Sequence, residues 1–137
     1  MKAVSEIVSH ALYFGLTILV ITFLVIYINN TKIDMRDKII DSNLNYVAET
    51  IKSNILDLYS LSKQTEIQGT IASIEIQDKK NYEVILENNK IIVKTNGKSI
   101  EKSIDIPLEM HGKSFLPAKL ELIREGNKEI IEIKEIS

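Results

Sequence analysis

The stretch EIVSHALYFGLTILVITFLVIYINN (Glu6–Asn30) decides how the rest of the chain is arranged. Between Ile7 and Ile28 it contains no Asp, Glu, Lys or Arg. At about 1.5 Å of rise per residue, a helix over these residues covers roughly 33 Å, close to the thickness of the ~30 Å hydrocarbon core. In lipid every backbone N–H needs an internal partner, so this run predicts a helix despite its many β-branched side chains.

A cleaved secretory signal is the competing interpretation of the same stretch. Its apolar core is about 7–15 residues long and is followed by small residues at a cleavage site. Here the apolar run is longer, and it ends in IYINNTK (Ile26–Lys32), which has no such site. The sequence therefore predicts a membrane span that is retained in the protein.

The orientation of this span is left open by the residues alone. Lys2 precedes it, whereas Lys32, Arg36 and Lys38 follow it among acidic neighbours. By the positive-inside rule, this small bias favours a cytoplasmic position for the part after the span.

Composition excludes several functional classes. The chain has 137 residues, with 17 basic and 19 acidic side chains and a formal net charge of −2. A nucleic-acid-binding protein normally shows a basic excess, so no nucleic-acid partner is expected. There are no cysteines, which excludes disulfides and thiolate metal sites.

After the span, residues 31–65 show helical periodicity and predict an amphipathic stalk. The apolar positions are Ile33, Ile40, Leu44, Val47, Ile51, Ile55, Leu58 and Leu61. Neither Pro nor Gly occurs between Leu16 and Gln68, so we expect one helix from about Val4 to Ser62. Its apolar stripe must be buried, either against the C-terminal domain of the same chain or against neighbouring subunits.

From residue 66 onward the pattern changes to alternation typical of strands. Six strands are predicted, at Thr70–Gln77, Tyr82–Glu87, Lys90–Thr95, Lys98–Ile106, Ala118–Arg124 and Glu129–Ile136. The connections DKKN, ENN, NG and EGN are turn-like.

The dipeptide Asn96-Gly97 predicts a two-residue type I′ hairpin, which sets Val93 opposite Ile100 on a buried face. Pro107 and Pro117 bracket LEMHGKSFL, which we interpret as an irregular crossover or a broken edge strand.

The expected fold class is α+β, with a long N-terminal helix followed by a small domain. The helix has a membrane-spanning half and an amphipathic half, and the domain is a small antiparallel β-sheet or a thin β-sandwich. The expected organisation is a hydrophobic helix at residues 1–30, a stalk helix at 31–65 and an antiparallel β domain at 66–137.

No catalytic, cofactor or metal site is expected. His10 lies at the start of the span and His111 in the predicted crossover loop, too far apart to share a metal ion. The zinc-protease, nucleophile-elbow, phosphate-loop and dinucleotide motifs are absent, so an enzyme is not predicted.

Three further features lie in or beside the span. Ala11 and Gly15 share a helix face, where small residues allow a second helix to approach closely. Asn29 begins the sequon Asn29-Asn30-Thr31, a candidate for glycosylation. Glu6 at the start of the span has a simple interpretation, since a hydrated carboxylate near a helix N-terminus interacts favourably with the helix dipole.

The stretch MKAVSEIVSHALYFGLTILV (Met1–Val20) resembles the class III signal and N-terminal helix of archaeal type IV pilin-like proteins, including archaellins. Lys2 matches the basic leader, Ala3-Val4 the start of the mature chain, and Ser5-Glu6 the polar pair before the apolar helix.

The resemblance implies an extracellular β domain and an apolar helix that waits in the membrane until it packs into a filament core. It implies processing at Lys2, Ala3 and Val4 by a prepilin-type signal peptidase. It also implies assembly through Glu6, Ala11 and Gly15, with the Glu6 carboxylate paired to the N-terminal ammonium of a neighbour. The partners would be further copies, other pilin-like subunits and, before assembly, membrane lipid.

Two functions are therefore expected from the sequence. The first is a non-enzymatic structural subunit, major or minor, of an archaeal type IV pilus-like surface filament. The alternative is a single-span membrane-anchored accessory protein of an archaellum or pilus machine, whose extracellular β domain binds the cell envelope or a partner protein. A short leader and an Ile/Leu/Phe-rich span favour a minor pilin or an anchored subunit.

Overall fold

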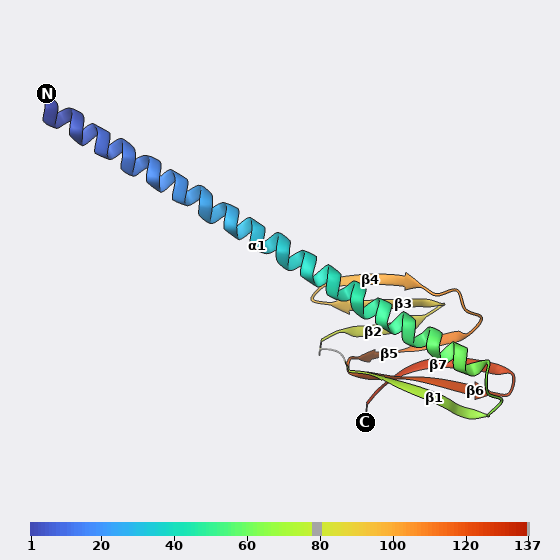
Figure 1. The fold of residues 1–137 in the computed structure, drawn as a ribbon. Coiled ribbons are helices and arrows are strands. Elements are labelled where there is room, and N and C mark those ends of the chain that lie inside the picture. The colour runs from blue at the N-terminus through green and yellow to red at the C-terminus, as the bar shows by residue number, and fades with distance from the viewer. Residues whose placement is uncertain (78–80, 137) are drawn as a thin grey trace. The chain divides into compact units, whose positions relative to one another are not determined.

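The computed structural model describes residues 1–77 and 81–136 (Figure 1). Its two compact units are Met1–Ile40, called here the N-terminal unit, and Asp41–Ser137, called here the β unit. Helix α1 runs from Lys2 to Ser62 and contributes to both units. The expected single helix from Val4 to Ser62 is confirmed, with a start two residues earlier.

Seven strands follow α1 and form one sheet. They are β1 (Gly69–Ile76), β2 (Glu83–Glu87), β3 (Lys90–Thr95), β4 (Lys98–Ser103), β5 (Glu109–Phe115), β6 (Ala118–Glu125) and β7 (Lys128–Glu135). Their order across the sheet is β1-β6-β7-β5-β2-β3-β4. All neighbouring strands are antiparallel except β5 and β7, which are parallel. The predicted α+β class is confirmed, and the sheet is single rather than a sandwich.

One face of α1 supplies the core of the β unit. Five of the predicted apolar positions are buried, each with at most 2% of its surface exposed: Leu44, Val47, Ile51, Ile55 and Leu58. Figure 1 shows this part of the helix crossing one face of the sheet. Two other positions of the predicted stripe stay exposed, Ile33 at 60% and Leu61 at 41%.

The sheet is apolar on the face that α1 covers and mostly polar on the other, where the half-buried pairs Ile85–Ile92 and Ile123–Ile130 also lie. In β6, Leu120 and Leu122 are buried, whereas Lys119 and Glu121, which alternate with them along the strand, are partly exposed. The same alternation places Val84 and Leu86 of β2 inside. A sheet with one solvated face needs a single covering layer, and the amphipathic part of α1 provides it.

The Asn96-Gly97 hairpin is confirmed. Both residues have positive φ, 46° at Asn96 and 77° at Gly97, as a type I′ turn requires. Val93 pairs with Ile100, as this turn predicts. The predicted turn DKKN falls largely on residues 78–80, outside the described part of the chain.

The predicted crossover at LEMHGKSFL is wrong, since these residues form β5, a central strand between β7 and β2. The prolines flank the strand without interrupting its hydrogen bonding. The predicted fourth strand is also too long, because β4 ends at Ser103 and the following residues form the connection to β5.

Gly112 explains how β5 can pack against β7. Its φ is +119°, and a Cβ at this position would lie 2.8 Å from the carbonyl oxygen of Ile133. Only a residue without a side chain permits this approach. The inward position that Gly112 leaves empty is one reason that the apolar alternation of β5 is hard to recognise in the sequence.

We expect Gly112→Ala to destabilise the β unit by ~3 kcal/mol, because it combines a backbone clash with an unfavourable φ. Urea unfolding of the full chain in mild detergent, followed by tyrosine fluorescence, measures this. Gly126→Ala is the matched control, since Gly126 also has positive φ (62°) but has no atom within 4 Å of the added Cβ. Equal losses for the two variants would contradict the packing role of Gly112.

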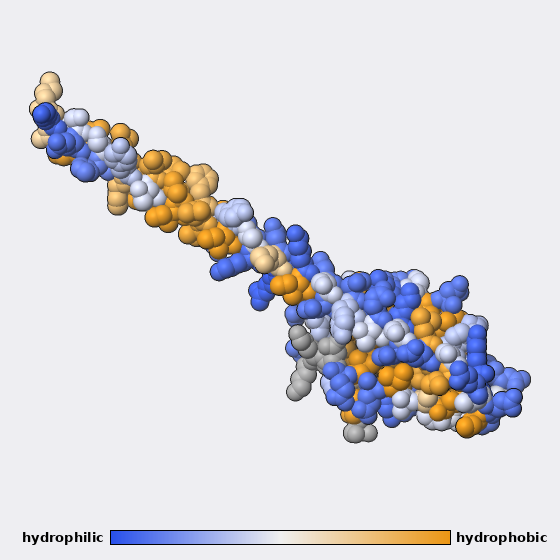
Figure 2. Space-filling view, viewed as in Figure 1, coloured by the Kyte–Doolittle hydropathy of each residue, from blue (hydrophilic) through white to orange (hydrophobic). Residues whose placement is uncertain are grey.

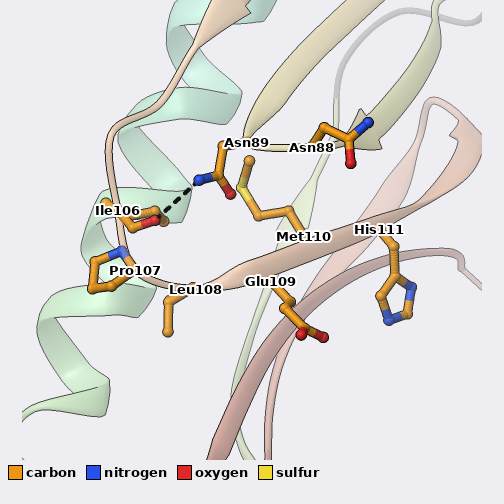
Figure 3. Close-up of a pocket in the computed structure, with 8 residues that line it drawn as sticks. All are labelled: Asn88, Asn89, Ile106, Pro107, Leu108, Glu109, Met110 and His111. Atoms are coloured by element: carbon orange, nitrogen blue, oxygen red, sulfur yellow. Dashed lines mark hydrogen bonds between the residues drawn. The ribbon is translucent and has the colours of Figure 1, made fainter.

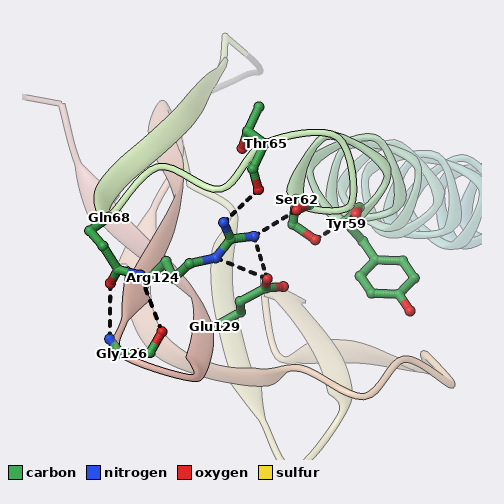
Figure 4. Close-up of polar contacts among 7 residues, drawn as sticks. All are labelled: Tyr59, Ser62, Thr65, Gln68, Arg124, Gly126 and Glu129. Atoms are coloured by element: carbon green, nitrogen blue, oxygen red, sulfur yellow. Dashed lines mark hydrogen bonds and ion pairs between the residues drawn. The ribbon is translucent and has the colours of Figure 1, made fainter.

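The C-terminal end of α1 is held by Arg124 of β6 (Figure 4). Its guanidinium donates hydrogen bonds to the backbone carbonyl oxygens of Ser62, at 2.6 Å, and Thr65. It also pairs with Glu129 of β7 at 2.6 Å, and its side chain is only 11% exposed. Carbonyls at a helix C-terminus lack partners within the helix, so a cation there satisfies them and interacts favourably with the helix dipole.

Arg124→Ala is expected to cost about 2–3 kcal/mol, because it leaves the carboxylate of Glu129 and two carbonyls without this donor. Lys128→Ala in the adjoining hairpin is the control, since Lys128 is 74% exposed and lies 4.0 Å from Glu109. An exposed pair of this kind contributes less than about 1 kcal/mol. Equal urea midpoints for wild type and Arg124→Ala would show that the contact does not stabilise the fold.

Candidate functional site

The N-terminal part of α1 carries an extended, exposed apolar surface. Every residue from Met1 to Asn30 is exposed, and apolar side chains dominate its surface in Figure 2. They include Phe14, Phe23 and Tyr27, which are 65–69% exposed. An exposed apolar surface of this extent marks contact with a membrane or with other proteins.

Helix α1 contains a segment that is long and apolar enough to cross a membrane, judged by length and composition, and no residue of that segment is buried within the protein. The hydroxyls of Thr17 and Thr22 donate to the carbonyl oxygens of Tyr13 and Ile18, at 2.7 and 2.8 Å. These polar groups are thus satisfied inside the helix, as a hydrocarbon environment requires.

The residues assigned to processing and assembly lie together at the start of α1. Lys2, Ala3 and Val4 already belong to the first helical turn, and the backbone N–H of Ser5 donates to the carbonyl oxygen of Met1 at 3.2 Å. Because the helix starts at Lys2, Glu6 follows the first turn instead of lying in it. Its carboxylate is exposed and free to reach a group outside the chain.

Ala11 and Gly15 lie one helical turn apart and are both exposed. A Cβ at Gly15 would meet no atom within 4 Å, so the backbone is open at this point. The structure therefore leaves room for the close helix contact that the small residues predict.

Asn29 of the candidate sequon lies within α1 and is exposed. The hydroxyl of Thr31, the third residue of the sequon, donates to the carbonyl oxygen of Tyr27 at 2.8 Å. The sequon is thus in regular helix, and its glycosylation stays a prediction.

In the β unit, the hollow beside the turn Asn88-Asn89 has a volume of about 630 Å³ and is shown in Figure 3. Asn89 donates from Nδ2 to the carbonyl oxygen of Ile106 at 3.4 Å, which closes one side. Glu109 and His111 point away from Asn89 and Met110, so the polar groups do not converge on one point (Figure 3).

His111 belongs to β5 and is not the loop residue that we expected. It is exposed on the polar face of the sheet, where Glu87 and Glu132 are its partners in register on the two adjoining strands. Among the described residues, no group of three or more His, Cys, Asp or Glu is placed to hold a metal ion.

Lysine and glutamate side chains form ion pairs across the polar face of the sheet. The Glu121 carboxylate accepts from the ammonium groups of Lys119, at 2.7 Å, and Lys134, at 3.1 Å. These two hydrogen bonds hold the pKa of Glu121 below its usual value. Around Glu121, acidic and basic side chains of this face are therefore paired with one another.

Because the pKa of Glu121 is lower in the folded state, its contribution to stability is present above the unfolded pKa of about 4.3 and is lost as the pH falls below that value. Between about pH 6 and pH 3, we expect the urea midpoint of Glu121→Gln to fall less than that of wild type. Glu125→Gln, an exposed carboxylate at the end of the same strand, should keep the wild-type dependence. Identical pH profiles for all three proteins would contradict a role for the Glu121 pairs.

Two features of the β unit were not singled out from the sequence. In the sequence, Arg124 is a charged residue beside the EGN turn with no distinguishing pattern. Its contact with the C-terminal end of α1 is visible only in the structure. The position of β1 at the edge of the sheet follows from the strand order. That order was not predicted, because strands that are neighbours in the sheet are not always neighbours in the sequence.

No protein-family model, curated protein or solved structure matches this chain.

Proposed function

We propose that this protein is a non-enzymatic structural subunit of a type IV pilus-like surface filament, anchored in the membrane by the apolar part of α1 before it assembles. The observation that supports this most directly is the complete exposure of the apolar residues from Ile7 to Ile28. Such a surface is stable in lipid or against other apolar helices, but not in water.

Glu6 gives the proposal its specificity. A carboxylate that enters an apolar environment is costly unless it is paired with a cation. In a filament, the N-terminal ammonium of a neighbouring subunit would supply that cation. Ala11 and Gly15 lie about 1.4 and 2.5 turns further along, on a different face of the helix from Glu6, and would allow another neighbouring helix to pack closely there.

The β unit would then face the cell exterior and form the outer surface of the filament. Its core is covered by apolar side chains of residues 44–58 of α1 from the same chain. Its polar sheet face and paired charges are compatible with exposure to solvent.

Glu6→Gln tests this function, because it keeps the shape of the side chain and removes its charge. The variant should insert into the membrane of its host at the wild-type level but be lost from sheared surface filaments. Ser9→Ala, on the same apolar segment, is the control and should assemble normally. Wild-type incorporation of Glu6→Gln would count against the role of the carboxylate.

A second candidate is a single-span anchored accessory protein that binds the cell envelope or a partner, and the self-contained core of the β unit favours it. The N-terminus of the mature protein separates the two functions. A chain that begins at Ala3 or Val4 by mass spectrometry supports the filament subunit. A chain that retains Met1 supports the anchor.

A further inference from the structure

Strand β1 is an edge strand of the sheet that the structure describes. It is the first strand in the order and pairs only with β6 among the strands that the structure describes. An irregularity between Thr70 and Ala72 interrupts its register, and from Ala72 to Ile76 the pairing is regular. Within residues 1–77 and 81–136, no strand pairs with the outer edge of this stretch, and the outward backbone donors and acceptors of an edge strand can extend a sheet by one more strand.

The opposite edge, β4, is protected in a way that β1 is not. β4 carries Lys98, Glu101 and Lys102. Its two lysines reach across to α1, where they pair with Asp41 at 3.3 Å and Glu49 at 3.0 Å. In contrast, Ala72–Ile76 contains one charged residue, Glu75, and neither Lys nor Pro. Charged side chains and proline are the usual means by which proteins block pairing at a sheet edge.

The regular stretch of β1 is complementary to itself. If a second β1 pairs with it antiparallel about Ile74, then Ala72 lies opposite Ile76, and Ser73 lies opposite Glu75. The first pairing sets a small side chain beside a large one on the helix-covered face. The second sets a hydroxyl donor beside a carboxylate on the polar face. In this register no two glutamates are directly opposite, so like charges do not disfavour it.

The surroundings of Ile74 and Ile76 are also open to an added strand. Ile74 is only half-buried, and next to Ile76 lies a hollow of about 230 Å³ lined on the α1 side by Tyr46, Thr50 and Asn54. These three α1 side chains are uncharged, Tyr46 is 66% exposed, and Glu75 of β1 also lines the hollow. In the proposed register, Ala72 of the second strand would lie opposite Ile76, beside this hollow, and Ile74 of the second strand would lie against Ile74.

We propose that β1 is a self-association edge through which two copies of the chain join their sheets about a two-fold axis at Ile74. The contact is isologous, since the same stretch is used on both sides, and it closes as a dimer. It does not depend on the proposed filament function, because it uses only residues of the β unit.

Cysteine cross-linking of the full-length protein in mild detergent tests the proposal, since the chain has no cysteine of its own. Directly opposite Cβ atoms in an antiparallel pair lie about 4.5–5.5 Å apart, within reach of a disulfide or a short bis-maleimide. Ile74→Cys should therefore give a covalent dimer. Ile100→Cys is the matched control, a half-buried isoleucine on the same face of the opposite edge strand, and should stay monomeric.

A second measurement uses exposed positions, so that it does not depend on how Ile74→Cys folds. Ser73→Cys and Glu75→Cys chains, when mixed, should cross-link to each other about tenfold faster than either does alone, because these positions are opposite in the proposed register and diagonal otherwise. A Glu6→Gln background should leave this result unchanged, which separates it from assembly through α1. Equal cross-linking at Ile74 and Ile100, or no dimer from the mixture, would overturn the proposal.

Discussion

The burial of one face of α1 by the sheet is the interaction on which the β unit depends. A seven-stranded sheet that is apolar on one face cannot stay in water alone, and the side chains from Leu44 to Leu58 cover that face. Polar contacts lie along the same interface: Lys98 and Lys102 of β4 pair with Asp41 and Glu49, and Arg124 of β6 donates to the C-terminal end of α1. The apolar contacts supply the driving force, and the largely exposed ion pairs at β4 add little to it.

Features that depend on neighbouring residues were predicted well from the sequence. The helix follows from periodicity and from the absence of Pro and Gly between Leu16 and Gln68. The Asn96-Gly97 turn follows from residues that tolerate positive φ, and it fixed the pairing of Val93 with Ile100. In each case the physical cause lies within a few residues of the effect, so a single sequence contains it.

Features that depend on distant residues were not predicted. β5 was missed because Gly112 and Ser114 occupy inward positions where an apolar residue would reveal the alternation. The parallel pairing of β5 with β7 and the place of Arg124 arise from chain crossing, which local pattern does not encode. The apolar segment of the candidate site was predicted from composition, whereas the role of Glu6 comes from family resemblance and remains a proposal.

The contact between α1 and the sheet has a mechanical consequence. A pull along the helix axis would load the buried side chains from Leu44 to Leu58 and the ion pairs of Asp41 and Glu49 simultaneously, in shear. Contacts loaded together resist rupture far better than contacts that peel apart in sequence, and the lifetime under tension then follows the unfolding rate. A force along α1 would therefore be opposed by its whole buried face at once, and not by one contact after another.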